Sequence, residues 1–407
     1  MIKKLLFTSL VGVSTLYGET LSELINLSQN NAHINGEKLQ VEALNEEYKS
    51  YKNSNLPNIE IGGTYIATNQ ETISVPNNGT SAYAKASFVL YDGDKRSSQY
   101  ESYEYNIKSS NYKLEQTKNN IALSIVAYYF NYQTLISQKE AKQKEIETLQ
   151  AQKQRLENFL AVGNITSDQV DKIDSSLQGA IVASHEIELQ IQTVLHDLQY
   201  ITGKEITISD KASINTNTEQ KIRADIKALE AASLAQLSNV ESAKSGLYPQ
   251  ITINDTYSMY DYNYDNNDYT NPENQNIASI NLAWNIFDFG ATKQKANAQY
   301  KQYLASQKNL EYEKNKANIE LKLALKSYEI AKLKIEAAHA NVKAANSTFE
   351  VIESQYQNGV MDNVTYLDAL SSKYNAQSVY EKSKNDLEIQ KAKILYYSGA
   401  NIQEFIQ

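Results

Sequence analysis

The chain has 407 residues, no cysteine, 4 prolines, 14 glycines and a formal net charge of −9. An acidic balance without basic clusters argues against a nucleic-acid partner, and the lack of cysteine excludes disulfides and a cysteine-linked lipid anchor. The scarcity of proline and glycine, beside abundant alanine, glutamine, lysine and glutamate, favours long helices over a compact α/β domain.

The N-terminal residues have the layout of a targeting segment. Lys3 and Lys4 precede an uncharged stretch from Leu5 to Leu16, and Gly18 follows. This order predicts a secretory signal peptide over residues 1–18, because about twelve apolar residues are too few to span a membrane as a helix. No later stretch approaches the ~20 apolar residues that such a helix needs. We therefore expect an exported protein that enters a membrane, if at all, as β-strands.

Three landmarks recur at one spacing, which indicates an internal duplication. Each pair lies 196 residues apart (for example 288 − 92): Asp92 and Asp288, Gly163 and Gly359, Gly203 and Gly399. The sequence therefore predicts a first repeat over 19–203, a linker over 204–219, a second repeat over 220–400 and a C-terminal tail over 401–407.

Each repeat changes its periodicity in the same order, from a helix to strands and then to a long helical hairpin. A single helix is expected over 20–53, at the start of the first repeat. The strands are expected at 57–91 and 249–288, and the hairpins at 94–203 with a tip near Gly163 and at 290–400 with a tip near Gly359.

The predicted strands alternate apolar and polar residues over about ten positions, which is typical of a tilted transmembrane strand with one lipid-facing side. In the second strand Ala84, Ala86 and Phe88 share one face. Phe88 and Trp284 are expected to be interfacial aromatic residues, and the polar hairpin tips over 69–80 and 260–276 to be external loops. A soluble antiparallel sheet packed on the helices is the alternative. Four strands cannot close a barrel, but three chains would supply twelve.

The predicted hairpins carry heptad patterns of the coiled-coil kind. Large apolar residues recur every seven positions in the first repeat, and small ones in the second, where the seam is Ala317, Ala324, Ala331 and Ala338. Small residues on one seam allow close helix pairing. A broad apolar stripe for a solid core is missing, so the pattern favours a hollow tube.

These features together resemble the TolC-like outer-membrane efflux family. The resemblance covers nearly the whole mature chain and includes both strand exits, Leu90-Tyr91-Asp92-Gly93 and Ile286-Phe287-Asp288-Phe289-Gly290, and the tip segment 357–369. It implies a homotrimer with a 12-stranded barrel in the outer membrane of a Gram-negative cell and a helical periplasmic tube, an α-barrel.

By the same resemblance, the protein would be the passive duct of a tripartite efflux or type I secretion system. Its implied partners are a periplasmic adaptor, an inner-membrane transporter and outer-membrane lipid. The alternative function is a soluble periplasmic coiled-coil adaptor or scaffold, although the Gly- and Val-rich segments usual in adaptors are missing from the sequence.

The resemblance also suggests residues of a periplasmic constriction. Asp368 matches the inner of two ring aspartates, and Thr365 stands where the outer one would be. Three copies of Asp368 around one axis would favour cations. A solvated residue at a helix start, favourable to the helix dipole, is the equal alternative for any one carboxylate here.

Further residues of the tips are suggested in the same way. Tyr356 matches a tyrosine of the closed-state link, Met361 replaces a basic link residue, and Asp168 lies within a residue of a link aspartate. The tips at Gly163 and Gly359 are expected to dock the adaptor.

No catalytic constellation is present, so we expect neither an enzyme nor a cofactor. The four histidines, His33, His185, His196 and His339, have no partner at metal-ligand spacing. The segment Asp261–Asp265 resembles half of a calcium loop, but it lacks the glycine at position six and has Pro272 where the final glutamate belongs. A tyrosine-rich surface loop is the favoured interpretation.

Overall fold

A computed structural model of the chain describes residues 18–209, 212–266, 268–270 and 272–407. Apart from Gly18, the expected signal peptide lies outside the described residues. The chain divides into two compact units. One contains the described residues up to Asn35 with Thr117–Arg223 and Ala317–Gln407, and the other contains Gly36–Gln116 and Ala224–Lys316. Among the described residues, no helix is both long and apolar enough to cross a membrane.

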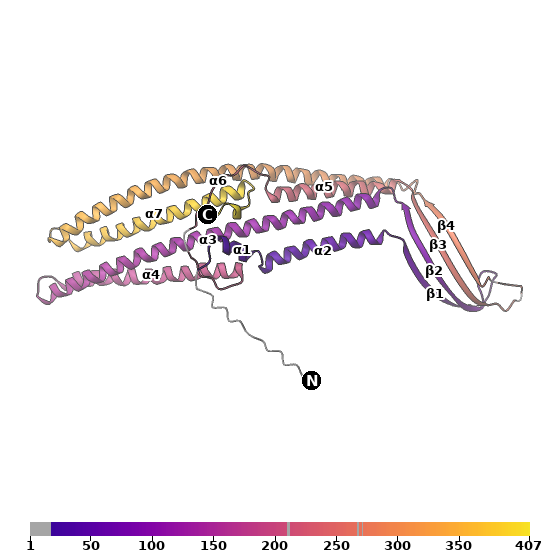
Figure 1. Cartoon of the computed structure of the whole chain (residues 1–407), viewed down its shortest axis with the longest axis horizontal. Coiled ribbons are helices and arrows are strands. Elements are labelled where there is room, and N and C mark those ends of the chain that lie inside the picture. The colour runs from indigo at the N-terminus through magenta and orange to yellow at the C-terminus, as the bar shows by residue number, and fades with distance from the viewer. Residues whose placement is uncertain (1–17, 210–211, 267, 271) are drawn as a thin grey trace, which may run out of the picture. The chain divides into compact units, whose positions relative to one another are not determined.

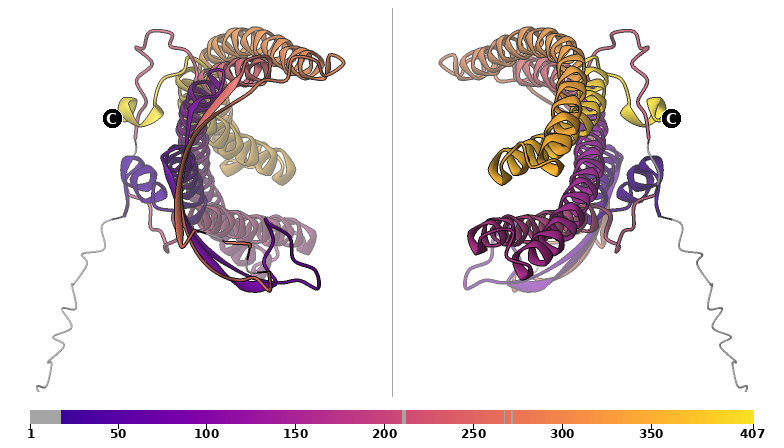
Figure 2. Two further views of the ribbon diagram at one scale, coloured as in Figure 1. Left: turned by 90° about the vertical axis from the view of Figure 1, so that its right-hand side faces the viewer. Right: turned by 90° about the vertical axis from the view of Figure 1, so that its left-hand side faces the viewer.

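The second of these units contains one antiparallel sheet in the order β1-β2-β3-β4 (Figure 1). The strands are β1 (Asn58–Ala67), β2 (Asn78–Tyr91), β3 (Gln250–Asn263) and β4 (Asn274–Ala283). They follow a common curve rather than a flat plane (Figure 2). The unit also contains α5 (Ala224–Lys244), the short 3₁₀ helix η1 (Ser245–Leu247) and parts of α2 (Ala32–Ser54), α3 (Lys95–Ala161) and α6 (Ala291–Gln357).

The two faces of the sheet differ in chemistry and in exposure. Ile61 is 82% exposed and Ile280 69% exposed, whereas the polar Ser81, Lys85 and Ser87 of the opposite face are half-buried. The apolar side of the period-two pattern is therefore the side that the described parts of this chain leave uncovered. Within the described sheet, the outer edges of β1 and β4 also carry no further strand.

The loops expected to be external are shorter than the sequence predicts. The loop expected over 260–276 loses residues at both ends, because β3 continues to Asn263 and β4 begins at Asn274. Tyr260 and Tyr262 are paired with β2, with Tyr262 opposite Gly79. The ring centroids of Tyr260 and Tyr262 lie 5.3 Å apart. Aromatic side chains at these positions favour strand over loop.

The other unit contains α1 (Leu21–Ser28), α4 (Ser167–Thr202), α7 (Asn363–Tyr397) and the 3₁₀ helix η2 (Ile402–Phe405), together with the remaining parts of α2, α3 and α6. The expectation of one helix over 20–53 is wrong, since α1 ends at Ser28 and α2 begins at Ala32. Thr20 and Glu23 form a capping box that starts α1, and the Asn31 side chain accepts from the Ile34 N–H at 2.7 Å to start α2.

The two long hairpins are present, with α3 and α6 of 67 residues each and returning helices α4 and α7 of 36 and 35. Figure 2 shows them end-on as separate helix pairs. Each tip turns at a glycine with positive φ, 75° at Gly163 and 72° at Gly359. The same pair of backbone hydrogen bonds closes each long helix, including Gly163 N to Leu160 O at 2.9 Å and Gly359 N to Tyr356 O at 3.1 Å. These are Schellman turns, which require a left-handed residue that glycine adopts at least cost.

One hydrophobic cluster joins most of the elements of this unit, including segments that the sequence suggested were a linker and a tail. Ile206, Ile214 and Ile402 are buried in this cluster with Leu21, Ile125 and Leu395. Ser213 and Gln407 exchange two backbone hydrogen bonds of 2.9 and 3.0 Å. The linker and tail are therefore part of the packed core. A second cluster, near the tips, includes Leu149, Leu177, Phe349 and Leu370 and packs the two hairpins against each other.

Candidate functional site

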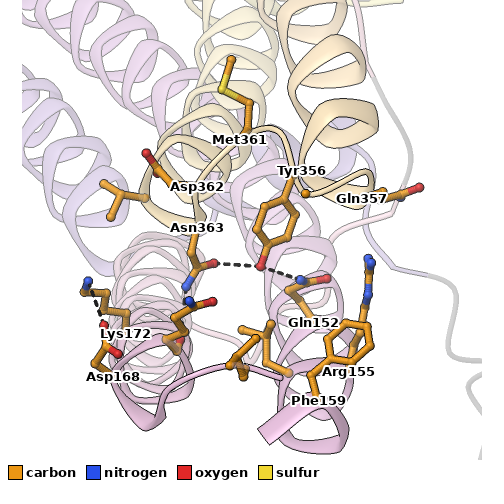
Figure 3. A pocket seen from close by; sticks show the side chains of 15 residues that line it. Gln152, Arg155, Phe159, Asp168, Lys172, Tyr356, Gln357, Met361, Asp362 and Asn363 are labelled. Carbon is orange, nitrogen blue, oxygen red and sulfur yellow. Dashed lines mark hydrogen bonds and ion pairs between the residues drawn. The ribbon is translucent and has the colours of Figure 1, made fainter. Parts of the chain in front are cut away.

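One residue from each of the four tip helices joins a line of hydrogen bonds, which we call the tip network. Gln152 of α3 donates to the Tyr356 hydroxyl of α6 at 2.8 Å, and that hydroxyl donates to Asn363 Oδ1 at 3.2 Å. Asn363, at the start of α7, donates in turn to the carbonyl oxygen of Gln169 in α4 at 3.1 Å. Figure 3 shows Tyr356 between Gln152 and Asn363. The network therefore ties the two hairpin tips together.

Aromatic packing supports the tip network from the side of the cluster. The rings of Tyr356 and Tyr366 stack at 4.5 Å with an interplanar angle of 18°, and Phe349 lies 5.9 Å from Tyr366. Burial raises the pKa of Tyr366 to about 12 and also raises the pKa of Tyr356. Both phenols are therefore neutral at physiological pH, so the Tyr356 hydroxyl keeps the proton that it donates to Asn363.

A pocket of about 420 Å³ opens between the two tips (Figure 3). Charges of both signs line it: Arg155 of α3 and Lys172 of α4, with Asp168 and Asp362. The Asp362 carboxylate caps α7 by accepting from the Thr365 N–H at 2.8 Å, and this hydrogen bond lowers the pKa of Asp362. The pocket thus combines apolar side chains such as Phe159 with charged groups, and its carboxylates are ionised.

The other suggested constriction residues lie around the tip network but do not join it. Asp368 is exposed on α7, and Thr365 contributes its backbone N–H to the Asp362 cap. Asp168 lies in the first turn of α4, where the Thr166 hydroxyl donates to it and lowers its pKa, and Lys172 lies 3.4 Å away. The Tyr356 hydroxyl therefore accepts its hydrogen bond from Gln152. The Asp168 carboxylate instead interacts with Thr166 and Lys172 at the start of its own helix.

Gln152 and Asn363 were missed by the sequence reasoning, although a signal for Gln152 exists. Leu149, Gln152 and Leu156 follow 3-4 spacing and are all buried, so Gln152 is a polar residue between two apolar ones on the same seam. A buried amide needs partners, and this requirement could have marked the position as a polar link. Asn363 carries no such local signal, because it follows its cap residue directly.

The two predicted interfacial aromatics lie near the strand ends that lead to the helices. Phe88 is on β2 opposite Ile253, with the Arg96 guanidinium 5.8 Å above its ring. Trp284 directly follows β4, is 54% exposed and donates to the Leu247 carbonyl oxygen at 3.1 Å. An indole with one bonded N–H and an exposed ring has the amphipathic form of an interfacial side chain.

The two loops at the opposite end of the strands are joined by hydrogen bonds. The Glu71 carboxylate accepts from the backbone N–H groups of Asp265 and Asn266, both at 2.7 Å, and Asn77 donates to Asp265 Oδ2 at 2.8 Å. The Asp265 carboxylate, part of the segment compared with a calcium loop, thus bonds to an amide side chain. No group of three acidic or histidine residues is placed to hold a metal ion in the described part of the chain.

Replacing Glu71 with glutamine should loosen this loop contact. An amide can accept from only one of the two N–H groups through its oxygen, and it loses the charge that strengthens both bonds. We expect hydrogen exchange at the Asp265 and Asn266 amides to accelerate about five- to tenfold. Glu273→Gln, an exposed change nearby, should leave both rates unaltered; equal rates in wild type and Glu71→Gln would show that the carboxylate does not hold the loop.

Comparison with known proteins identifies the family. The model of the family described as outer membrane efflux protein matches residues 24–204 and 217–400, once in each repeat. Among solved structures, CusC has a TM-score of 0.82 at 17% identity, and the match covers 93% of this chain and 92% of the CusC chain. CmeC of Campylobacter jejuni has a TM-score of 0.80 at 17% identity, and the match covers 94% of this chain and 86% of CmeC. VceC of Vibrio cholerae has a TM-score of 0.81 at 14% identity, and the match covers 94% of this chain and 96% of VceC.

No curated protein sequence matches the chain. The structural likeness shows that the fold is that of TolC-like channels, and the family match spans both repeats. The chain therefore belongs to the outer membrane efflux protein family, and it is an efflux channel of the outer membrane with a large helical periplasmic part.

Proposed function

We propose that three copies of this chain assemble into a passive export duct, in which the sheets form a closed ring of twelve strands in the outer membrane. The helices then form the periplasmic tube, and its tips meet a periplasmic adaptor bound to an inner-membrane transporter. Such a duct supplies a path and no chemistry, so its substrate is chosen by the transporter.

The observation that carries this proposal is the uncovered apolar face of a sheet with two open edges. An unpaired strand edge is not tolerated in lipid, because each unsatisfied backbone group costs several kcal/mol there. Ring closure between β1 of one copy and β4 of the next removes both edges at once. The apolar face, with Ile61 and Ile280, then faces lipid, and the polar face with Lys85 and Ser87 lines the water-filled interior.

Cysteine cross-linking tests the assembly directly, since the chain has no cysteine of its own. Ile61→Cys on β1 should be combined in turn with a cysteine at each exposed apolar position on the same face of β4, namely Ala278, Ile280 and Leu282. Oxidation of the protein in outer-membrane vesicles should give disulfide-linked dimers and trimers for one register. Monomers alone across the whole β4 series, in a protein recovered from the soluble fraction, would overturn the duct.

The tip network supports a second part of the proposal, namely that the duct is held closed at its periplasmic end. Tyr356 and Asn363 of one hairpin bond to Gln152 and Gln169 of the other, so the tips cannot separate without breaking these bonds. An adaptor that binds the two tips apart would shift the population toward the open form.

Asp368→Asn should reduce the cation preference of the duct in planar bilayers. Three exposed carboxylates at one level of the narrow end would attract cations and repel anions, and the substitution removes this charge without changing side-chain size. The reversal potential under a salt gradient should move toward that of an unselective pore. Glu42→Gln, an exposed charge change on α2, is the control; if both variants behave alike, Asp368 does not line the constriction.

A further inference from the structure

The turn between β4 and α6 holds a phenylalanine in a conformation that large side chains avoid. Phe289 has φ +56° and is followed by Gly290 at +85°. The equivalent turn of the first repeat has Gly93 at +67° and Asp94 at +65°, and Gly93 is the position that matches Phe289 at the 196-residue spacing (289 − 93). A bulky residue in the left-handed region is strained, and glycine would relieve the strain.

Packing within the described chain does not explain this aromatic residue. Phe289 is 89% exposed and Phe287 is 73% exposed, and their rings touch each other at 4.7 Å. Between them, the Asp288 carboxylate accepts from the N–H groups of Gly290 at 2.9 Å and Thr292 at 2.8 Å. The turn is therefore held by its own hydrogen bonds while it projects two apolar rings into solvent, and both the strain and the exposure are unfavourable in water.

The surroundings of the two rings match one kind of surface. Toward the sheet, they are preceded along the chain by the exposed apolar residues Ile280, Leu282 and Trp284. Toward the helix, they are followed by the exposed Lys293 and Lys295, and the first turn of α6 has no acidic residue. Apolar residues, then aromatic residues, then cations is the order met on passing from hydrocarbon through the interface to anionic headgroups.

We propose that Phe287, Phe289, Lys293 and Lys295 form an interfacial anchor that binds the anionic phospholipid surface of the outer membrane on the side of the helices. The rings insert at the level of the headgroups, and the lysines bind phosphate groups. This inference rests on the proposed function, because it needs β4 to lie in the membrane. It assigns a membrane-docking role to the turn and explains why a strained phenylalanine occupies a position where the other repeat has glycine.

Tryptophan fluorescence can test the anchor, because Trp284 is the only tryptophan in the chain. The variant Trp284→Phe/Phe289→Trp of the full mature protein is reconstituted into vesicles containing phosphatidylglycerol with bromine atoms near the headgroup or near the chain end. Quenching is expected to be stronger with the shallow bromine, and iodide should quench weakly. Trp284→Phe/Phe287→Trp is a second reporter that does not place tryptophan in the left-handed conformation.

The control variant Trp284→Phe/Tyr200→Trp places the probe at a 90% exposed position of α4, where iodide should quench and brominated lipid should not. If both reporters respond only to iodide, the turn lies in water; if they respond to neither quencher, protein covers it, as a neighbouring copy would. Either result overturns the anchor. Wild-type Trp284 distinguishes failure of the anchor from failure of the proposed duct. If brominated lipid does not quench wild-type Trp284, the placement of β4 in the membrane is wrong as well.

The lysines are tested by vesicle composition. For the Phe289→Trp reporter, replacing phosphatidylglycerol with phosphatidylcholine should reduce lipid quenching, and Lys293→Gln/Lys295→Gln should remove this difference between the two lipids. Lys308→Gln, further along α6, should retain the difference. An unchanged dependence on anionic lipid in the double lysine variant would exclude the lysines from the anchor.

Discussion

Asn363→Ala is expected to open the periplasmic end of the channel. Asn363 is only 6% exposed and is the central bond partner between Tyr356 and the Gln169 carbonyl. Its removal leaves both groups without that partner, at a cost of about 1–3 kcal/mol, which corresponds to a shift of about 5- to 150-fold between closed and open tips. Single-channel recording should show higher conductance or longer open times, and cells should become permeable to large antibiotics.

Asn358→Ala provides the matched control, because this exposed asparagine at the same tip donates only within its own helix, to Ser354 O at 2.9 Å. Tyr356→Phe removes one hydroxyl and keeps the stacking on Tyr366, so it should act in the same direction with a smaller effect. The two changes share only the Tyr356–Asn363 bond, so the double variant should exceed Asn363→Ala alone, but by less than the full effect of Tyr356→Phe. If the assembled Asn363→Ala protein has wild-type conductance, the tip network does not control gating.

Ile125→Ala is expected to have the largest effect on stability. Ile125 is fully buried in the cluster where α1, α3, α4, the linker and the C-terminal segment meet. Truncation there removes buried methyl groups and leaves a cavity, which costs about 2–5 kcal/mol. The urea midpoint of the helical signal should fall, and amides of the linker near Ile214 should exchange faster. Tyr200→Ala, at a 90% exposed site, should change stability by less than about 0.5 kcal/mol; equal midpoints for the two variants would contradict the core assignment.

The sequence was informative wherever the determining interactions are local or periodic. Gly163 and Gly359 could be identified as hairpin tips because a helix end needs a residue that tolerates positive φ. The alternation of Ala84, Ala86 and Phe88 similarly predicted strands with one apolar face. Helix continuity was harder to judge, and the break before Ala32 depends on the Asn31 side chain capping a new helix in a stretch that is otherwise helix-compatible.

The length, the duplication, the heptad seams and the alternating strands were sufficient by themselves to determine the fold class and the family resemblance, since these patterns follow from backbone geometry that repeats along the chain. Only the tertiary structure decided that Gln152 meets Tyr356, 204 residues away, and that the linker and tail join the core. The tertiary structure alone also revealed the left-handed backbone conformation of Phe289. Contacts between distant residues depend on how whole helices pack, and the strain at Phe289 depends on how β4 must turn into α6, neither of which a local pattern encodes.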